Sequence, residues 1–259
     1  MKNNNPIGIF DSGIGGTTIC TEVIKLLPNE NIMFLADQKN APYGIKTKEE
    51  IIALSIKNVD YLMNNGCKLI VVACNTATTN AIDALRATFS IPIIGIEPAI
   101  KPAALQTSTA KIGVLATKGT ITSSFFSSKI KLYPNIQIIE QIGYNLVNLI
   151  ETGQIHSQEM KDTLKDYLIP MVEQGIDTLV LGCTHYPYLV PMIKEIVPSY
   201  VNVIDSGEAV AKQTKKLLTD NNLLNLQTEK GEYCYYTNVE PTILKSFAPS
   251  NVSVEQIDF

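Results

Sequence analysis

Two cysteines lie in similar surroundings, each after an apolar segment and before polar residues. Cys74 lies in L-I-V-V-A-C-N-T-A (69–77), and Cys183 lies in T-L-V-L-G-C-T-H-Y (178–186). Where a buried strand runs into a helix, free N–H groups and the helix dipole can lower a thiol pKa from about 8.5. Each cysteine is therefore a candidate nucleophile or general base. A structural role is the commoner fate of a cysteine and is expected for Cys20, Cys67 and Cys234.

Two thiols in equivalent surroundings have a specific chemical use. If one thiolate removes a proton from a carbon atom and an opposed thiol returns a proton to the other face, the product is the mirror image at that carbon. A racemase requires this two-sided arrangement, whereas a hydrolase with one nucleophile does not. The paired cysteines therefore favour a racemase.

Other polar residues near these segments could assist proton transfer. His185 lies two residues after Cys183 and could hold the thiolate or protonate it. Asp11 ends an apolar segment, and its spacing is equally consistent with proton transfer and with capping the next helix. His156, the only other histidine, lies in a polar stretch and is expected on the surface. Tyr43, in the Pro/Gly turn A-P-Y-G, fits a structural role by its position.

The glycine-rich loop D-S-G-I-G-G-T-T (11–18) does not predict a nicotinamide site, because its G-x-G-G spacing differs from G-x-G-x-x-G. Its glycines are expected to allow close approach of the backbone and to begin a helix whose N–H groups bind a carboxylate. Neither cysteine loop contains a lysine that could form a pyridoxal Schiff base. No C-x-x-C pair occurs among the five cysteines, which argues against a zinc site and a disulfide framework. We therefore expect no cofactor and no metal.

The composition is typical of a packed globular protein and excludes several other classes. Hydrophobic residues make up 45% of the 259 residues, and charged residues make up 18%. The longest apolar runs fall far short of the ~18 residues of a membrane span, and the N-terminus has no signal-peptide core, so a cytoplasmic protein is expected. The net charge is -4 and no basic run is interleaved with aromatics, so direct nucleic-acid binding is not expected. A site for an anion would have to be built locally from helix N-termini and hydroxyl groups.

Short β-branched segments alternate with helical patterns along the chain. Residues 51–63 have apolar side chains at close to helical spacing, including Ile51, Leu54 and Leu62. Strands that alternate with helices predict an α/β fold with a doubly wound parallel sheet. The expected strands cover 7–10, 31–36, 69–73, 91–96, 112–116, 136–140, 178–182 and 201–204.

Three segments have a counterpart 105 to 109 residues further along the chain, in the same order. A nearly constant offset indicates two similar α/β units. Ligands bind outside the carboxyl ends of parallel strands, where equivalent strand ends of two units would oppose each other. We therefore expect two similar doubly wound parallel-sheet domains, with Cys74 and Cys183 facing each other across the cleft between them. The matched segments are 7–18 with 112–120, 69–77 with 178–186 and, more loosely, 93–99 with 202–209.

Together these segments resemble the motifs of bacterial glutamate racemases, within the aspartate/glutamate racemase family. The resemblance extends from Ile7 to about Ala211. It implies an N-terminal domain of residues 1–96 completed by 207–259, a second domain of residues 97–206 inserted in it, and an active site between the two. The motifs are D-S-G-I-G-G (11–16), A-P-Y-G (41–44), A-C-N-T-A-T (73–78), I-G-I-E-P (94–98), I-G-V-L-A-T-K-G-T (112–120) and L-G-C-T-H-Y-P (181–187).

The resemblance also implies a reaction, a cofactor-independent 1,1-proton transfer that converts L-glutamate to D-glutamate for peptidoglycan synthesis. By similarity, Cys74 deprotonates D-glutamate with the help of Asp11. Cys183 deprotonates L-glutamate with the help of His185. Glu151, in L-I-E-T-G, matches an acidic residue near the cleft. The positions that match substrate-binding residues are Asp11, Ser12, Pro42, Tyr43, Gly44, Cys74, Asn75, Thr76, Thr117, Thr120, Cys183, Thr184 and His185.

Several alternatives stay open. A relative that acts on aspartate or another small acid would share the two-cysteine plan. The resemblance to glutamate racemases also bears on partners. Glutamate racemases are commonly homodimers and some restrain DNA gyrase, so a homodimer is expected, whereas a gyrase partner is a secondary hypothesis. A thiol redox sensor is disfavoured because no resolving cysteine lies near either thiol in the sequence. Some members have an N-terminal extension linked to activation by a peptidoglycan precursor; only six residues precede Ile7, so no such dependence is expected.

Overall fold

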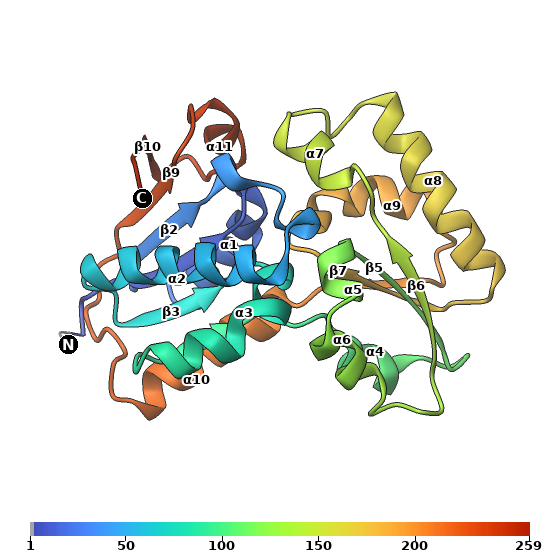
Figure 1. Ribbon diagram of the computed structural model, residues 1–259, viewed down its shortest axis with the longest axis horizontal. Coiled ribbons are helices and arrows are strands. Elements are labelled where there is room, and N and C mark those ends of the chain that lie inside the picture. The colour runs from blue at the N-terminus through green and yellow to red at the C-terminus, as the bar shows by residue number, and fades with distance from the viewer. Residues whose placement is uncertain (1–2) are drawn as a thin grey trace.

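The computed structural model describes residues 3–259 and contains two parallel sheets with helices on both faces of each (Figure 1). The strand order is β10-β9-β2-β1-β3-β4 in the first sheet and β6-β5-β7-β8 in the second. The predicted α/β class with two parallel-sheet units is confirmed. The strands are β1 (Ile7–Asp11), β2 (Ile32–Ala36), β3 (Leu69–Val72), β4 (Ile93–Gly95), β5 (Lys111–Ala116), β6 (Gln137–Ile142), β7 (Thr178–Gly182), β8 (Asn202–Ile204), β9 (Tyr233–Thr237) and β10 (Ser253–Gln256).

The helices cover both faces, and the central strands β1 and β3 are accordingly buried along their whole length. Ile9 packs with α1 and α10 on one face of the first sheet, and its neighbour Phe10 packs with α2 and α3 on the other. The helices are α1 (Thr17–Leu26), α2 (Lys48–Asn64), α3 (Asn75–Thr88), α4 (Ile100–Gln106), α5 (Lys118–Ile121), α6 (Ser124–Ile130), α7 (Leu146–Glu151), α8 (Gln158–Glu173), α9 (Val190–Ile196), α10 (Gly207–Asp220) and α11 (Thr242–Phe247).

The two sheets repeat one strand order. The order β2-β1-β3-β4 of the first sheet recurs as β6-β5-β7-β8 in the second. The three sequence matches therefore fall on strands in equivalent positions, β1 with β5, β3 with β7 and β4 with β8. The first sheet is larger because β9 and β10, from the end of the chain, extend it beyond β2.

The chain passes between the two sheets twice. The first passage lies between β4 and α4, and the second between β8 and α10. The Ser206 hydroxyl donates a hydrogen bond to the Glu97 carbonyl, which joins the two passages. Beyond the second passage, α10 packs against α1 on the first sheet.

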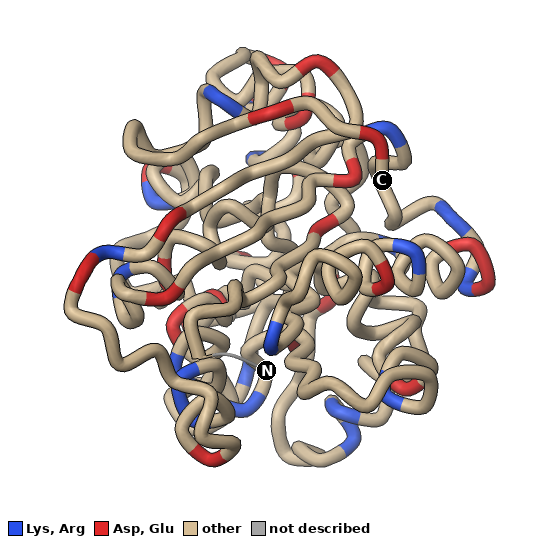
Figure 2. Tube along the Cα trace, turned by 90° about the vertical axis from the view of Figure 1, so that its left-hand side faces the viewer, with Lys and Arg blue, Asp and Glu red and all other residues tan. Residues whose placement is uncertain are grey.

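Positions of both charge signs are interspersed along the chain. Figure 2 shows Lys and Arg positions and Asp and Glu positions in both the upper and the lower part of the trace. Within residues 3–259, no helix combines the length and the apolar composition needed to cross a bilayer.

Candidate active site

Cys74 lies between β3 and α3 and caps the first turn of that helix. Its Sγ accepts a hydrogen bond from the Ala77 N–H at 3.4 Å, and its thiol donates toward the Ser12 hydroxyl at 3.6 Å. Burial raises the pKa of Cys74 well above its ordinary value, and Asp11 and Cys183 raise it further. The Ala77 N–H lowers this pKa but does not outweigh burial. The expected lowering of the Cys74 pKa at a helix end is therefore wrong, because the site excludes water from the thiol.

Asp11 ends β1 and is fully buried. Its Oδ2 accepts hydrogen bonds from the Gly16 N–H at 2.8 Å and from the Thr184 hydroxyl at 3.4 Å. Its Oδ1 has no hydrogen-bond partner in the described part of the chain. Burial raises the pKa of Asp11 to about 6, although His185 and Cys74 lower it. The contact with Gly16 lies at the start of α1, so it is compatible with a capping role, and a carboxyl group with a pKa near 6 and an unpaired oxygen is also suited to proton exchange near neutral pH.

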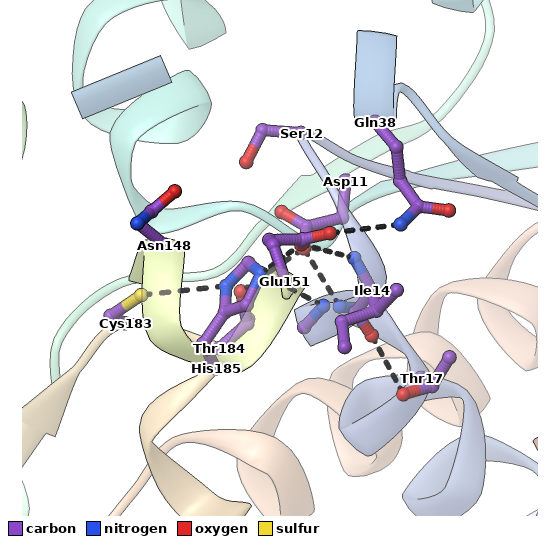
Figure 3. A network of polar contacts seen from close by, with 12 residues as sticks. Asp11, Ser12, Ile14, Thr17, Gln38, Asn148, Glu151, Cys183, Thr184 and His185 are labelled. Atoms are coloured by element: carbon purple, nitrogen blue, oxygen red, sulfur yellow. Dashed lines mark hydrogen bonds and ion pairs between the residues drawn. The ribbon is translucent and has the colours of Figure 1, made fainter. Parts of the chain in front are cut away.

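Cys183 follows β7 and faces an imidazole. Its Sγ lies 3.7 Å from Nδ1 of His185, whose Nε2 lies 2.5 Å from Oε1 of Glu151 (Figure 3). Burial alone would lower the pKa of His185, but its contacts with Cys183 and Glu151 raise it well above its ordinary value. These contacts favour the charged form of the ring, whose Nδ1 faces Cys183.

The glycine-rich loop after β1 makes room for this ion pair. A Cβ atom on Gly13 would lie 1.8 Å from Oε1 of Glu151, and one on Gly15 would lie 2.3 Å from Nδ1 of His185. Between these glycines, the Ile14 N–H donates to Oε1 of Glu151 at 2.7 Å. The expected close approach of the backbone is observed. The carboxylate that this loop contacts in the structure is that of Glu151, from the second sheet's side, and the binding of a substrate carboxylate by the loop stays a prediction.

A second group of contacts crosses the cleft between α3 and α5. Oγ1 of Thr76 lies 2.7 Å from Oγ1 of Thr117, and the Thr117 hydroxyl donates to that of Thr120 at 3.1 Å. The Asn80 amide donates to the Gly119 carbonyl at 2.9 Å. Three predicted substrate-binding threonines therefore lie together, at the first turn of α3, where free N–H groups favour an anion.

The side chain of Asn75 is buried beside Cys74, and neither its Oδ1 nor its Nδ2 has a hydrogen-bond partner within residues 3–259. Buried polar atoms are nearly always paired in folded proteins. Asn75, like Oδ1 of Asp11, therefore retains hydrogen-bonding capacity for a further molecule. Both groups lie at the carboxyl ends of neighbouring strands, β1 and β3.

The loop between β2 and α2 holds Tyr43 in a structural role. The Tyr43 hydroxyl donates to Oδ2 of Asp37 at 2.5 Å and accepts from the Asn58 amide at 3.2 Å. Tyr43 is only 1% exposed, and burial, then Asp37 and to a smaller degree the nearby Cys74 raise the pKa of its hydroxyl. The adjacent Gly44 reaches the cleft, since a Cβ atom there would lie 3.0 Å from Cβ of Thr117. His156 is exposed, as expected.

Sequence reasoning missed one residue that touches this site. The Gln38 amide donates to Oε2 of Glu151 at 2.9 Å (Figure 3). Its sequence signal is weak: Gln38 is one of four polar residues, D-Q-K-N, that follow the strand next to β1. No group of three or more His, Cys, Asp or Glu within residues 3–259 is arranged to hold a metal ion.

The sequence of this chain is similar to those of known proteins. A family model described as Asp/Glu/Hydantoin racemase matches residues 15–214. A glutamate racemase from Herpetosiphon aurantiacus is 45% identical over 242 residues, which cover 93% of this chain and 95% of the relative. The matched region of this chain includes both cysteine segments.

Solved structures give the same result for the fold. A glutamate racemase from Bacillus anthracis superposes with a TM-score of 0.90 at 31% identity, covering 99% of this chain and 98% of the other. A glutamate racemase from Francisella tularensis in complex with D-glutamate superposes with a TM-score of 0.86 at 32% identity, with the same coverage of 99% and 98%. Two parallel-sheet domains are thus the shared architecture.

Proposed function

This chain belongs to the Asp/Glu/Hydantoin racemase family, and we propose that it interconverts L- and D-glutamate by proton transfer between Cys74 and Cys183 on opposite faces of the substrate. It is an isomerase of the glutamate racemase type. One observation carries the two-thiol mechanism: the cysteines follow β3 and β7, which hold equivalent positions in the two sheets. The proximity of Cys183 is also among the causes of the raised pKa of Cys74, after burial and Asp11, which supports placing the two thiols near each other.

The reaction from L-glutamate begins at Cys183. Its thiolate, which lies beside the imidazole of His185, removes the α-proton, and the electron pair of the C–H bond stays on the α-carbon and spreads into the adjacent carboxylate. The Cys74 thiol then donates its proton to the opposite face. The enzyme is left with a thiol at Cys183 and a thiolate at Cys74, and proton exchange with solvent restores the starting form.

The surroundings of the two thiols support this starting form. The raised pKa of Cys74 favours its thiol, which is the form that donates a proton. In the reverse direction Cys74 has to lose its proton, and Asp11 is the nearest candidate acceptor because its pKa is about 6 and its Oδ1 is unpaired. Asp11 therefore assists Cys74, and His185 assists Cys183.

Substrate binding uses the polar groups that surround the cysteines. The unpaired amide of Asn75 can accept from and donate to an amino acid. Hydroxyl groups and helix N–H groups supply the anion site that a chain with a net charge of -4 has to build locally. Besides Asp11, Asn75 and the cysteines, the proposed binding residues are Ser12, Pro42, Tyr43, Gly44, Thr76, Thr117, Thr120, Thr184 and His185.

The wider biological setting is part of the same proposal. We place the D-glutamate product in peptidoglycan synthesis and the enzyme in the cytoplasm as a homodimer. We also propose domain boundaries at 96/97 and 206/207. Their support is that the strands within 7–95 and 233–256 form one sheet, whereas those within 111–204 form the other.

Exchange of the α-hydrogen with solvent deuterium tests the two-thiol mechanism. Without added pyridoxal phosphate or metal, Cys74→Ala is expected to exchange the α-hydrogen of L-glutamate only, and Cys183→Ala that of D-glutamate only. Racemisation falls at least about 100-fold in both variants, because each lacks one general acid or base. NMR of the α-proton together with chiral chromatography measures exchange and inversion separately.

Cys234→Ala is the control, because Cys234 lies in β9 and is expected to leave both exchange reactions unchanged. Racemisation by a Cys74→Ala, Cys183→Ala double variant would contradict the mechanism. A faster reaction with aspartate than with glutamate in a panel of amino acids would contradict the substrate.

A further inference from the structure

A chain of polar contacts connects strand β9 to Cys183 through two residues that the mechanism above does not use. The Thr237 hydroxyl donates to Oε1 of Gln38 at 2.8 Å. The Gln38 amide in turn donates to Oε2 of Glu151 at 2.9 Å. Glu151 then contacts His185, which faces Cys183 (Figure 3). A residue near the C-terminus is thereby connected with a thiol of the second sheet.

The direction of each hydrogen bond in this chain is determined by its neighbours. The Val239 N–H donates to Oγ1 of Thr237 at 3.3 Å, so the Thr237 hydroxyl keeps its own proton for Oε1 of Gln38. The amide NH2 of Gln38 is then directed at Glu151. If the amide were turned over, its oxygen would face the carboxylate and the two acceptors would repel each other. Thr237, which is fully buried, therefore stabilises the orientation of Gln38 that binds Glu151.

The contact with Gln38 also determines which oxygen of Glu151 meets His185. Glu151 is the last residue of α7, and its side chain reaches across the cleft to the loops after β1 and β2. Gln38 occupies Oε2, whereas the Ile14 N–H and His185 share Oε1. With both oxygens held, the carboxylate has one orientation, and the imidazole ring that it binds keeps Nδ1 toward Cys183.

We propose that Gln38 and Thr237 are positioning residues for the proton transfer at Cys183, in that they fix the carboxylate of Glu151 and through it the ring of His185. This inference rests on the proposed function. Neither residue touches the reacting atoms; each acts through Glu151. The titratable groups that face the Glu151–His185 pair from the packed elements are Cys183, Asp11 and Tyr188.

A matched pair of variants separates positioning from packing. Thr237→Ser keeps the hydroxyl, whereas Thr237→Val keeps the shape and loses it. We expect Thr237→Ser to stay within about twofold of the parent, and Thr237→Val and Gln38→Leu to lower kcat/KM about 10-fold, as for loss of a hydrogen bond to a charged group. Enantiomers have equal free energies, so kcat/KM has to fall equally in both directions, and the affected face has to be identified by pH dependence.

The pH profile supplies a readout that a purely structural role would not change. Glu151 helps to keep the pKa of His185 raised, so a loosened Glu151 lowers that pKa. The imidazolium is present only below its pKa; the alkaline limb of kcat/KM is therefore expected to move to lower pH in Thr237→Val and Gln38→Leu, but not in Thr237→Ser. Thermal unfolding of the three variants shows whether each is folded.

The outcomes distinguish this inference from the function on which it rests. A parent enzyme that does not racemise glutamate would contradict the proposed function. An active parent whose Gln38→Leu variant keeps both the rate and the pH profile would overturn the positioning role alone. If Thr237→Val and Thr237→Ser lowered kcat/KM equally and did not shift the alkaline limb of the pH profile, Thr237 would have a packing role and the positioning role would be wrong for that residue.

Discussion

Asp11 is expected to destabilise the fold at neutral pH. Its pKa is about 6 in the folded chain, compared with 3.8 for an exposed aspartate, mainly because burial disfavours the charged form. The folded state therefore binds a proton more tightly than the unfolded state between these values, and stability falls as pH rises through that window. From this shift, Asp11→Asn is expected to stabilise the protein by at most about 3 kcal/mol at pH 7.5. Urea unfolding at about pH 4 and pH 7.5 measures the difference in free energy of unfolding between the variant and the parent. This difference is expected to be near zero at the lower pH.

Asp83→Asn is a suitable control, because Asp83 lies on an exposed position of α3 and its replacement is expected to change stability little at either pH. An Asp11→Asn variant that is less stable than the parent at pH 7.5 would show that the carboxylate stabilises the fold. Such a result would contradict the raised pKa. The same variant is expected to racemise poorly, since Asp11 is the proposed proton acceptor from Cys74.

At the level of single residues, sequence reasoning was most successful where residue type and local context carry the chemistry. Cys74, Cys183 and His185 were identified from their positions after apolar strands, and the structure brings His185 against Cys183. The protonation of these groups could not be predicted in the same way. The raised pKa of Cys74 results from burial among residues that lie far away in the sequence, which outweighs the helix N-terminus that the local pattern does reveal.

The loop between β2 and α2 depends on the C-terminal segment for its anchorage. The Asn238 amide donates to Oδ1 of Asp37 at 2.6 Å, and Oδ1 of Asn238 accepts from the Lys39 N–H at 2.9 Å. Asp37 in turn binds the Tyr43 hydroxyl. Asn238→Ala removes two hydrogen bonds from this loop, which bears three proposed substrate-binding residues. We expect KM for glutamate to rise about 10-fold with a smaller change in kcat, measured by steady-state kinetics.

Asn202→Ala provides the comparison. Asn202 lies in β8, and its amide donates to the Gln106 side chain, away from this loop. It is expected to leave KM unchanged. If Asn238→Ala lowered kcat and left KM unaltered, the loop would contribute to the chemical step, and its assignment to substrate binding would be wrong.

Strands and helices could be predicted from the sequence because each is encoded locally. The segment 51–63 lies within α2, and all eight expected strands are present at their expected places in the chain. The internal repeat also predicted the equivalence of β3 and β7, since similar strand-loop-helix units adopt similar positions in similar sheets. The contacts of β9 with the site could not be predicted in this way. Thr237 and Gln38 are 199 residues apart, and no local pattern shows that β9 pairs with β2.

The two cysteines are buried where the two domains meet, and contacts between the domains cover them. Cys74 is 4% exposed and Cys183 is 6% exposed. Contacts from both sides cross the cleft, including Ile14 with Glu151 and Thr76 with Thr117. Glutamate can reach the thiols only if these contacts open. The two passages between the sheets, joined at Ser206, are the natural place for such a motion because only two segments of chain have to bend.

Alkylation by iodoacetamide tests this opening with the five free cysteines as internal probes. Cys234 is half-buried in β9, next to the edge strand β10, and is expected to react first. Cys183 and Cys74 are expected to follow, because opening of the cleft costs less free energy than global unfolding. Cys20 and Cys67, buried within the first domain, are expected to react last. Mass spectrometry of the peptides gives each rate, normalised to the rate in urea so that intrinsic reactivity cancels.

Saturating L-glutamate provides a second test, because a ligand held by both domains stabilises the closed form. At a concentration of about 100 times Kd, the ligand stabilises the closed form by about 2.7 kcal/mol. The alkylation rates of Cys74 and Cys183 are then expected to fall about 100-fold, since alkylation of these thiols requires the domains to open. The alkylation rate of Cys234 is expected to stay constant, because that thiol is accessible without opening. If Cys74 and Cys183 reacted no faster than Cys20 and Cys67, the cleft would open only when the protein unfolds. Substrate entry would then require a route other than separation of the two domains.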